Sequence, residues 1–579
     1  MQFSDVHKSR FLPSDRYLMW LLLAIFCVLC FLSQREKSVT VDEYNHFPSG
    51  IYNLLTGDWR MDRQSPPLVK CFPGLSAVLT APKVHLKPFA QDPNAWKFGY
   101  DFMHRNPNRY IALFEWGRVL IILLGCFGGW VLYHFTRQIF GSNGALFALL
   151  LFVFNPNVLA HSRLVTVDIG ATAIFLLSVF AFWKFLGNMG LKNAAISGVM
   201  LGLAQVSKFT CLILYPLFII FFAIVLAHNG YMERRKNPTT MGKSIISATS
   251  PIAAFSFMVL ISLFVINSAY MFSNVFFYFK DYAFASTALN ALTLSPIQSI
   301  PIPLPLEYVR GFDIQLDISS GKSPFYMGYL MGKHSMAGWP HYYLIGMLVK
   351  NPEAMVVILL VSLYAWFKTT PRPELRTWLC IWGTVLMYLA YFSLFTNTLI
   401  GIRFLLPIFP LLFLATGALL SRNFLTNSRS RVLLSFLTIL YILPAIMSYP
   451  NYLSYFNWAS GGSQKGHHWL IDSNLDWGQD LPALKEYMVR ESIDHIKLGY
   501  FGRVDPHLYG INYDLAQKEI EGGVHAISVN FLVGRPYYLL GNNGRLTLID
   551  FSYFRRYREL KPRAILGNTI YIFEKGESP

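Results

Sequence analysis

Long apolar runs separated by short polar segments fill the first 450 residues of the chain. An α-helix needs about 20 residues to cross the hydrocarbon core of a bilayer. Runs of about that length predict eleven membrane-spanning helices, at 17–33, 112–133, 144–160, 168–186, 195–207, 210–227, 245–269, 352–367, 377–396, 404–420 and 432–448. The run 195–207 is short, and Lys208 separates it from the run that follows.

The composition agrees with a membrane protein. Of the 579 residues, 54% are hydrophobic and only 14% are charged, whereas soluble proteins carry about 25% charged residues. This balance excludes a soluble globular enzyme, and it also excludes a disordered, collagen-like or coiled-coil chain. We therefore expect a polytopic α-helical membrane protein.

Much of the net charge of +17 comes from basic residues in the short loops between the predicted spans. Basic residues gather in alternate short loops, which the positive-inside rule places in the cytoplasm. This sets the N-terminus on the cytoplasmic side, and it makes a nucleic-acid partner unnecessary. The residues expected on that side are Lys8, Arg10, Arg16, Arg137, Lys184, Lys192, Arg234, Arg235, Lys236, Lys243, Lys368, Arg372, Arg376, Arg422, Arg429 and Arg431.

With this orientation the long polar segments 34–111, 270–351 and 449–579 lie outside. The last contains strand-like runs among Gly and Asn turns, at His495–Phe501, Ala526–Leu532 and Thr569–Phe573. We expect a transmembrane domain over residues 1–448 and a small periplasmic α/β domain over 449–579.

Two acidic positions sit where the chain leaves the bilayer. Asp42 and Glu43 directly follow the first apolar run, and His46 shares a helix face with Asp42 at a spacing of four. Asp168 lies at the outer end of another run. A partly desolvated carboxylate is costly without a partner or a function. The two acids suit a general base or a divalent-cation site, although a polar helix cap is the plainer alternative for each.

Cations occupy the same predicted face. Each alone fits an interfacial side chain that reaches back to water, but beside the acids they could together hold a lipid phosphate. They are Arg63, Lys70, Arg118, Lys208, Lys350 and Arg403.

The order of several motifs resembles that of the polyprenyl-phosphate-sugar-dependent glycosyltransferases with the GT-C fold. The similarity is to the protein O-mannosyltransferase-like and aminoarabinose-transferase-like group (glycosyltransferase family 39-like), and it spans roughly residues 17 to 490. The segments that carry it are Asp42-Glu43, Gly57–Arg60, Pro66-Pro67-Leu68, Asn155–His161 with Asp168, Arg403–Pro407, Tyr452–Asn457 and Asp472–Leu481.

The resemblance implies an inverting transfer of a sugar from an undecaprenyl- or dolichyl-phosphate donor to a hydroxyl of a protein, lipid or glycan. The reaction would take place at the outer face of a bacterial inner membrane. Asp42 matches the acid that activates the acceptor, Glu43 and His46 its companions, Asp168 the second outer acid and Arg403 a cation near the lipid phosphate.

One departure concerns the residues before the proline pair. Relatives carry Glu-His or Glu-Lys there, whereas this chain has Gln64-Ser65, so Lys70 or Arg63 is the expected substitute. The candidate catalytic residues are thus Asp42, Glu43 and Asp168, and a divalent cation is left open. The candidate substrate-binding residues are His46, Arg63, Lys70, Arg118, Lys208 and Arg403.

Two other classes of function compete with an enzyme. A secondary transporter places its polar residues near the middle of the bilayer, whereas the acids here cluster at its outer edge. A non-catalytic, lipid-binding assembly subunit would tolerate replacement of Asp42 and Asp168. For Asp472–Leu481, the alternatives are a turn that ties the outer domain to the membrane part and a wall of an acceptor groove.

Overall fold

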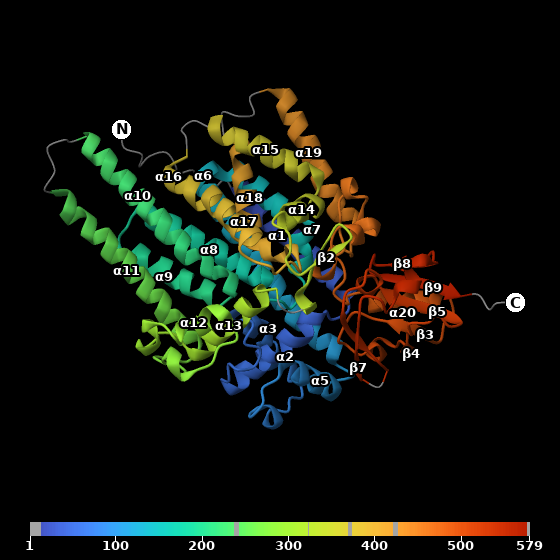
Figure 1. Cartoon of the computed structure of the whole chain (residues 1–579). Coiled ribbons are helices and arrows are strands. Elements are labelled where there is room, and N and C mark those ends of the chain that lie inside the picture. The colour runs from blue at the N-terminus through green and yellow to red at the C-terminus, as the bar shows by residue number, and fades with distance from the viewer. Residues whose placement is uncertain are drawn as a thin grey trace.

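The computed structural model describes residues 13–236, 243–321, 324–368, 373–420, 427–542 and 544–575. A body of long helices occupies the upper part of Figure 1, the first outer loop lies below it, and the strands of the C-terminal domain lie to one side. Of the basic residues expected in the cytoplasm, Lys8, Arg10, Arg372 and Arg422 lie outside the described residues.

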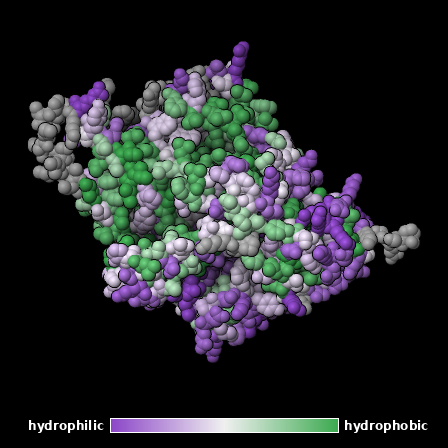
Figure 2. All heavy atoms as spheres, in the orientation of Figure 1, coloured by the Kyte–Doolittle hydropathy of each residue, from purple (hydrophilic) through white to green (hydrophobic). Residues whose placement is uncertain are grey.

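Apolar helices build the body. Several present large apolar side chains outward, among them Leu260 and Phe264, as helices do when lipid surrounds them. Figure 2 shows the hydrophobic surface over this body and hydrophilic surface along the lower margin and the C-terminal domain. The helices are α1 (Pro13–Arg35), α6 (Tyr110–Val153), α8 (Asp168–Gly187), α9 (Leu191–Gln205), α10 (Leu214–Lys236), α11 (Lys243–Ala269), α15 (Glu353–Lys368), α16 (Leu375–Trp378), α17 (Thr384–Leu394), α18 (Phe409–Thr416) and α19 (Ser428–Met447).

The polytopic helical architecture is confirmed, but the number of spans differs from eleven. Among the described residues, eight helices are long and apolar enough to cross a membrane, or nine if α14 (Tyr342–Val349) and α15, bent by 110°, form one span. The short run 195–207 lies on α9, which has only 15 residues.

The runs 112–133 and 144–160 were predicted as separate spans, and both fall on α6. Its 44 residues correspond to roughly 66 Å of helix, about twice the thickness of the hydrocarbon core. Gly141 breaks the helical geometry with a φ of 78°, a value that glycine adopts readily. The second run ends early, at Val153, because Asn155 caps a new helix, α7 (Pro156–His161).

The two long loops lie together at one end of the body, opposite the end of α10 and the start of α11 (Figure 1). The first loop contains α2 (Val41–Thr56), α3 (Pro67–Gly74), α4 (Ala77–Thr80) and α5 (Ala95–Arg105). The second contains α12 (Thr287–Leu292), α13 (Leu306–Ser319), β1 (Gly328–Leu330), β2 (Lys333–Ser335) and α14.

The C-terminal domain is a mixed sheet of order β4-β3-β5-β9-β8, accompanied by the separate hairpin β6–β7. Strand β3 runs parallel to β4 and β5, and β9 runs antiparallel to β5 and β8. The predicted strand-like runs coincide with parts of β3, β5 and β9. The elements are α20 (Leu481–Arg490), β3 (Ile496–Gly499), β4 (Tyr513–Leu515), β5 (Gly523–Ser528), α21 (Val529–Leu532), β6 (Tyr537–Leu540), β7 (Leu546–Ile549), β8 (Ala564–Leu566) and β9 (Ile570–Lys575).

The Asp472–Leu481 segment ties this domain to the first outer loop. The backbone N–H of Val41 donates to Trp477 O at 3.1 Å, and that of Ser38 donates to Gln479 O at 2.9 Å. Buried Lys37 forms an ion pair of 2.5 Å with Asp480. These bonds fix the start of α2 against the C-terminal domain. The proposed boundary at residue 448 stays a prediction.

A buried ion pair anchors α2 to α6. Arg118 Nε and Nη2 donate to the two carboxylate oxygens of Glu43, each at 2.7 Å. Glu43 also accepts from the backbone N–H of Thr40 and of Val165. Arg118 donates further to the carbonyls of the 34–38 turn. Neither side chain has spare hydrogen-bonding capacity, so the pair holds the loop in place.

We predict that Arg118→Leu costs about 3–5 kcal/mol of unfolding free energy, because it leaves Glu43 buried and unpaired. Thermal unfolding of the purified protein measures this. Arg105→Leu is the matched control, since Arg105 forms an exposed pair with Asp101 and should change stability by under about 1 kcal/mol. An Arg118→Leu protein of normal stability would show that the pair does not anchor the loop.

Candidate active site

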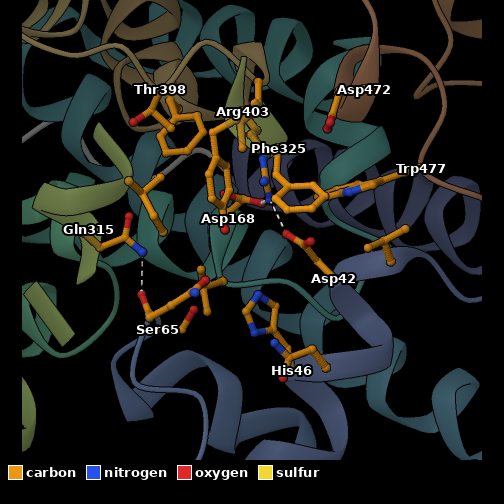
Figure 3. A pocket seen from close by; sticks show the side chains of 18 of the residues that line it. Asp42, His46, Ser65, Asp168, Gln315, Phe325, Thr398, Arg403, Asp472 and Trp477 are labelled. Atoms are coloured by element: carbon orange, nitrogen blue, oxygen red, sulfur yellow. Dashed lines mark hydrogen bonds and ion pairs between the residues drawn. The ribbon is translucent and has the colours of Figure 1, made fainter. Parts of the chain in front are cut away.

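A cavity of about 280 Å³ lies where the first loop, the outer ends of the body helices and the C-terminal domain meet. Five of the predicted site residues line it: Asp42, His46, Asp168, Lys208 and Arg403. Figure 3 shows Arg403 between Asp42 and Asp168, with His46 and Asp472 around them.

Helix α2 supplies the first acid and the histidine. Asp42 and His46, four residues apart, both line the cavity, as their helical spacing predicts. His46 Nδ1 lies 2.9 Å from the carboxylate of buried Asp62. Burial opposes the charge on the imidazole, but the Asp62 carboxylate outweighs it, and the pKa of His46 is raised above its ordinary value.

Asp168 is the first residue of α8, and among the described residues its Oδ2 accepts no hydrogen bond. The carboxylate instead faces cations. Lys208 Nζ donates to Oδ1 at 2.6 Å, and Oδ2 lies 3.7 Å from Arg403 Nη1. Its side chain is 1% exposed. The capping alternative is therefore not what the structure shows; Asp168 is a buried counter-ion.

Arg403 joins the two acids. Its Nη1 donates to Asp42 Oδ2 at 2.7 Å. The same Nη1 lies 3.7 Å from Asp168 Oδ2. The guanidinium carbon lies 4.4 Å from the centre of the Trp477 ring. The Asp42 side chain is 25% exposed, so this carboxylate is open to the cavity in a way that Asp168 is not.

The chain around Arg403 is held by the C-terminal segment. Asn474 Oδ1 accepts from the backbone N–H of Ile402 at 2.8 Å, and Ser473 Oγ donates to Ile400 O at 2.5 Å. Lys350 lies beneath this segment, with its ammonium donating to the carbonyls of Leu453, Tyr455 and Asn474. Lys350, expected near the phosphate, is thus a buried structural cation.

Four other predicted site residues do not line the cavity. Glu43 and Arg118 point into the anchor between α2 and α6. Arg63 pairs with Glu307. The buried ammonium of Lys70 donates to the carbonyls of Met61 and Asp62 at 3.1 and 2.6 Å. Their assignment to catalysis or substrate binding therefore stays a prediction that the cavity does not support, and neither Arg63 nor Lys70 lies at the cavity wall.

The cavity also has walls that the sequence did not indicate. Gln64 and Ser65, noted only as a departure, line it directly. Asp472 also lines the cavity, and its motif had pointed to it in the sequence. No sequence pattern indicated the cations and aromatic rings at the outer end of the cavity. These are Arg503, Arg535, Trp96, Phe325, Tyr326, Tyr537 and Tyr538.

The donor set does not fit a divalent cation. Within the described residues, no three His, Cys, Asp or Glu side chains gather as a metal site would require. Asp42 and Asp168 face Arg403 and Lys208, which already neutralise them.

Residues 114–256, about a quarter of the chain, match the model of the dolichyl-phosphate-mannose-protein mannosyltransferase family. This confirms the resemblance found in the motifs over the segment that supplies Asp168 and Lys208. No curated protein matches the chain.

Solved structures similar to this chain include those of ArnT and AglB. ArnT from Cupriavidus metallidurans bound to undecaprenyl phosphate is 13% identical with a TM-score of 0.45, covering 82% of this chain and 72% of that one. The archaeal oligosaccharyltransferase AglB from Archaeoglobus fulgidus, in complex with an inhibitory peptide and a dolichol-phosphate, is 11% identical with a TM-score of 0.43, covering 96% and 75%.

The raised pKa of His46 gives a pH-dependent stability with a defined sign. A histidine whose pKa is higher in the folded state contributes its stability below the unfolded value of about 6.5, and loses it as the pH rises through the folded value. We predict that the unfolding temperature of the wild type falls over this range more steeply than that of His46→Gln. The unfolding temperature of Asp62→Asn should also fall less steeply than that of the wild type, because the carboxylate that raises the pKa of His46 is then absent. Parallel curves for all three proteins would contradict a raised pKa of His46.

Proposed function

We propose that this chain transfers a sugar, with inversion, from a polyprenyl-phosphate donor to a hydroxyl acceptor at the outer face of a bacterial inner membrane. The observation that carries the proposal is the bridge of Arg403 between Asp42 and Asp168, with Lys208 beside it, in one cavity. The matched family supports it, since its name specifies a dolichyl-phosphate sugar as donor.

The position of the charges along the helices supports a lipid-borne donor. Asp168 begins the apolar segment Asp168–Gly187, Lys208 immediately precedes Phe209–Glu233, and Arg403 is the second residue of Ile402–Leu420. All three therefore sit where apolar helices begin, at the depth of a lipid headgroup. The phosphate of a polyprenyl donor lies at this depth when its tail is in the hydrocarbon.

The exposure of the two acids assigns them different roles. Asp42 opens to the cavity and, among the described residues, forms its ion pair with Arg403, so it can accept the proton of an acceptor hydroxyl while the sugar carbon is attacked. Asp168 is buried and orients Lys208 and Arg403. These cations stabilise the departing lipid phosphate, which leaves as an anion and needs no general acid.

The ion pair between Arg403 and Asp42 links donor binding to catalysis. While Asp42 Oδ2 accepts a hydrogen bond from Arg403, that oxygen is occupied and is not available to take the proton of an acceptor hydroxyl. A donor phosphate would compete with Asp42 for Arg403. Binding of the donor would therefore release Asp42 at the moment when a base is required.

We predict that Asp42→Asn lowers turnover of an undecaprenyl-phosphate sugar by about 10²–10⁴-fold, the usual contribution of a positioned base. The same variant should bind undecaprenyl phosphate at least as tightly as the wild type, because Arg403 has lost a competitor. Sugar transfer, or donor hydrolysis, and lipid binding are measured on the same preparation. Asp101→Asn, on the surface of α5, is the control.

Two results would contradict these roles. If turnover survived in Asp42→Asn, the base would lie elsewhere. If undecaprenyl phosphate bound more weakly to this variant, Asp42 would contribute to donor binding rather than compete with it.

A further inference from the structure

Arg503 stands in a cage of aromatic rings at the outer end of the cavity. Its guanidinium carbon lies 5.1 Å from the ring centre of Trp96, 5.0 Å from that of Tyr537 and 4.9 Å from that of Tyr538. Trp96 belongs to α5 in the first loop, and the two tyrosines belong to β6. All four side chains line the cavity. Two distant parts of the chain thus build one cationic position.

The other cations of the cavity each have a carboxylate partner. Arg403 pairs with Asp42, Lys208 with Asp168, and Arg535 with Asp472 at 2.5 Å. Among the residues that the structure describes, Arg503 forms no ion pair; its side chain hydrogen-bonds to Tyr537, but its buried Nε has no hydrogen-bond partner. Aromatic faces compensate a desolvated guanidinium only in part. Arg503 is therefore left with capacity to bind an anion.

The place of Arg503 in the fold separates it from the donor end. Lys208 and Arg403 sit at the beginnings of apolar helices, whereas Arg503 follows β3 in the C-terminal domain. The cavity thus has a cationic group at the depth of the membrane edge and another on the domain outside it. Asp42, the proposed base, faces the same cavity from α2.

We propose that Arg503 binds an oxyanion, a phosphate or carboxylate group carried by the acceptor, and so places the acceptor hydroxyl toward Asp42. This inference rests on the proposed function and specifies the acceptor as anionic. A guanidinium suits this task because its planar donors match the oxygens of both groups. The rings hold the guanidinium in one orientation before the ligand arrives, which lowers the entropy lost on binding.

The test uses the full-length protein saturated with undecaprenyl phosphate, so that the donor end is occupied, and titrates it with methyl phosphate and with acetate by calorimetry. The lipid-loaded wild type should bind at least one of these anions, and Arg503→Gln should weaken that binding about 10-fold or more. Arg503→Lys keeps the charge and should retain part of it. Arg310→Gln is the matched control, because Arg310 also lies on an aromatic ring, that of Tyr282, but outside the cavity.

Three outcomes would overturn the inference. The first is that neither anion binds the lipid-loaded wild type. The second is that an anion binds Arg503→Gln as tightly as the wild type. A lower unfolding temperature with unchanged anion binding would then identify Arg503 as a link between the first loop and the C-terminal domain. The third is that Arg503→Gln loses undecaprenyl phosphate binding, which would assign Arg503 to the donor.

The design separates this inference from the proposed function. If the wild type bound no undecaprenyl phosphate at all, the proposed donor site would be contradicted. The anion titration of the lipid-free protein, compared between Arg503→Gln and Arg403→Gln, would still decide whether Arg503 binds an oxyanion.

Discussion

The arrangement of the site depends on the guanidinium of Arg403, which lies between two carboxylates of unequal exposure. Its Nη1 is 2.7 Å from Asp42 and 3.7 Å from Asp168. Buried charges persist only where opposite charges and hydrogen bonds compensate them, so Asp168, which also pairs with Lys208, holds the cation in place. Asp42 is the partner that faces open space, and it is the group that a substrate can displace or use.

Three separate parts of the chain must meet for this bridge to form. Helix α2 carries Asp42 and is anchored to α6 through Glu43 and Arg118. The beginnings of apolar helices supply Asp168, Lys208 and Arg403. The C-terminal segment fixes the backbone on both sides of residue 401 through Ser473 and Asn474. The outer domain is thus a structural part of the site, and its motif near residue 472 serves both as a tie and as a cavity wall.

The sequence predicted the helical architecture and singled out five residues that line the cavity, in both cases for local reasons. Asp42 and His46 share a face because they are four residues apart in one helix, and Asp168, Lys208 and Arg403 interrupt or border apolar runs. Glu43 follows Asp42 in the sequence but does not line the cavity, because adjacency in sequence does not mean adjacency in space. Successive helical residues point about 100° apart, and this turns Glu43 away from the cavity toward α6.

The outer half of the site was invisible to sequence reasoning because it forms only when distant elements dock. Trp96 and Arg503 are separated by about 400 residues, and no local pattern brings them together. Lys70 and Lys350 do not line the cavity either, for a related reason. A lysine near a membrane edge looks alike in sequence whether its ammonium meets a phosphate or, as here, the carbonyl oxygens of neighbouring loops.

The central claim is that the donor phosphate and Asp42 compete for Arg403. A double-mutant cycle on undecaprenyl phosphate binding tests it most directly, with Asp42→Asn, Arg403→Gln and the double variant. The account predicts that Asp42→Asn tightens binding when Arg403 is present and has no effect when Arg403 is replaced by Gln. An equal effect of Asp42→Asn in both backgrounds would contradict it.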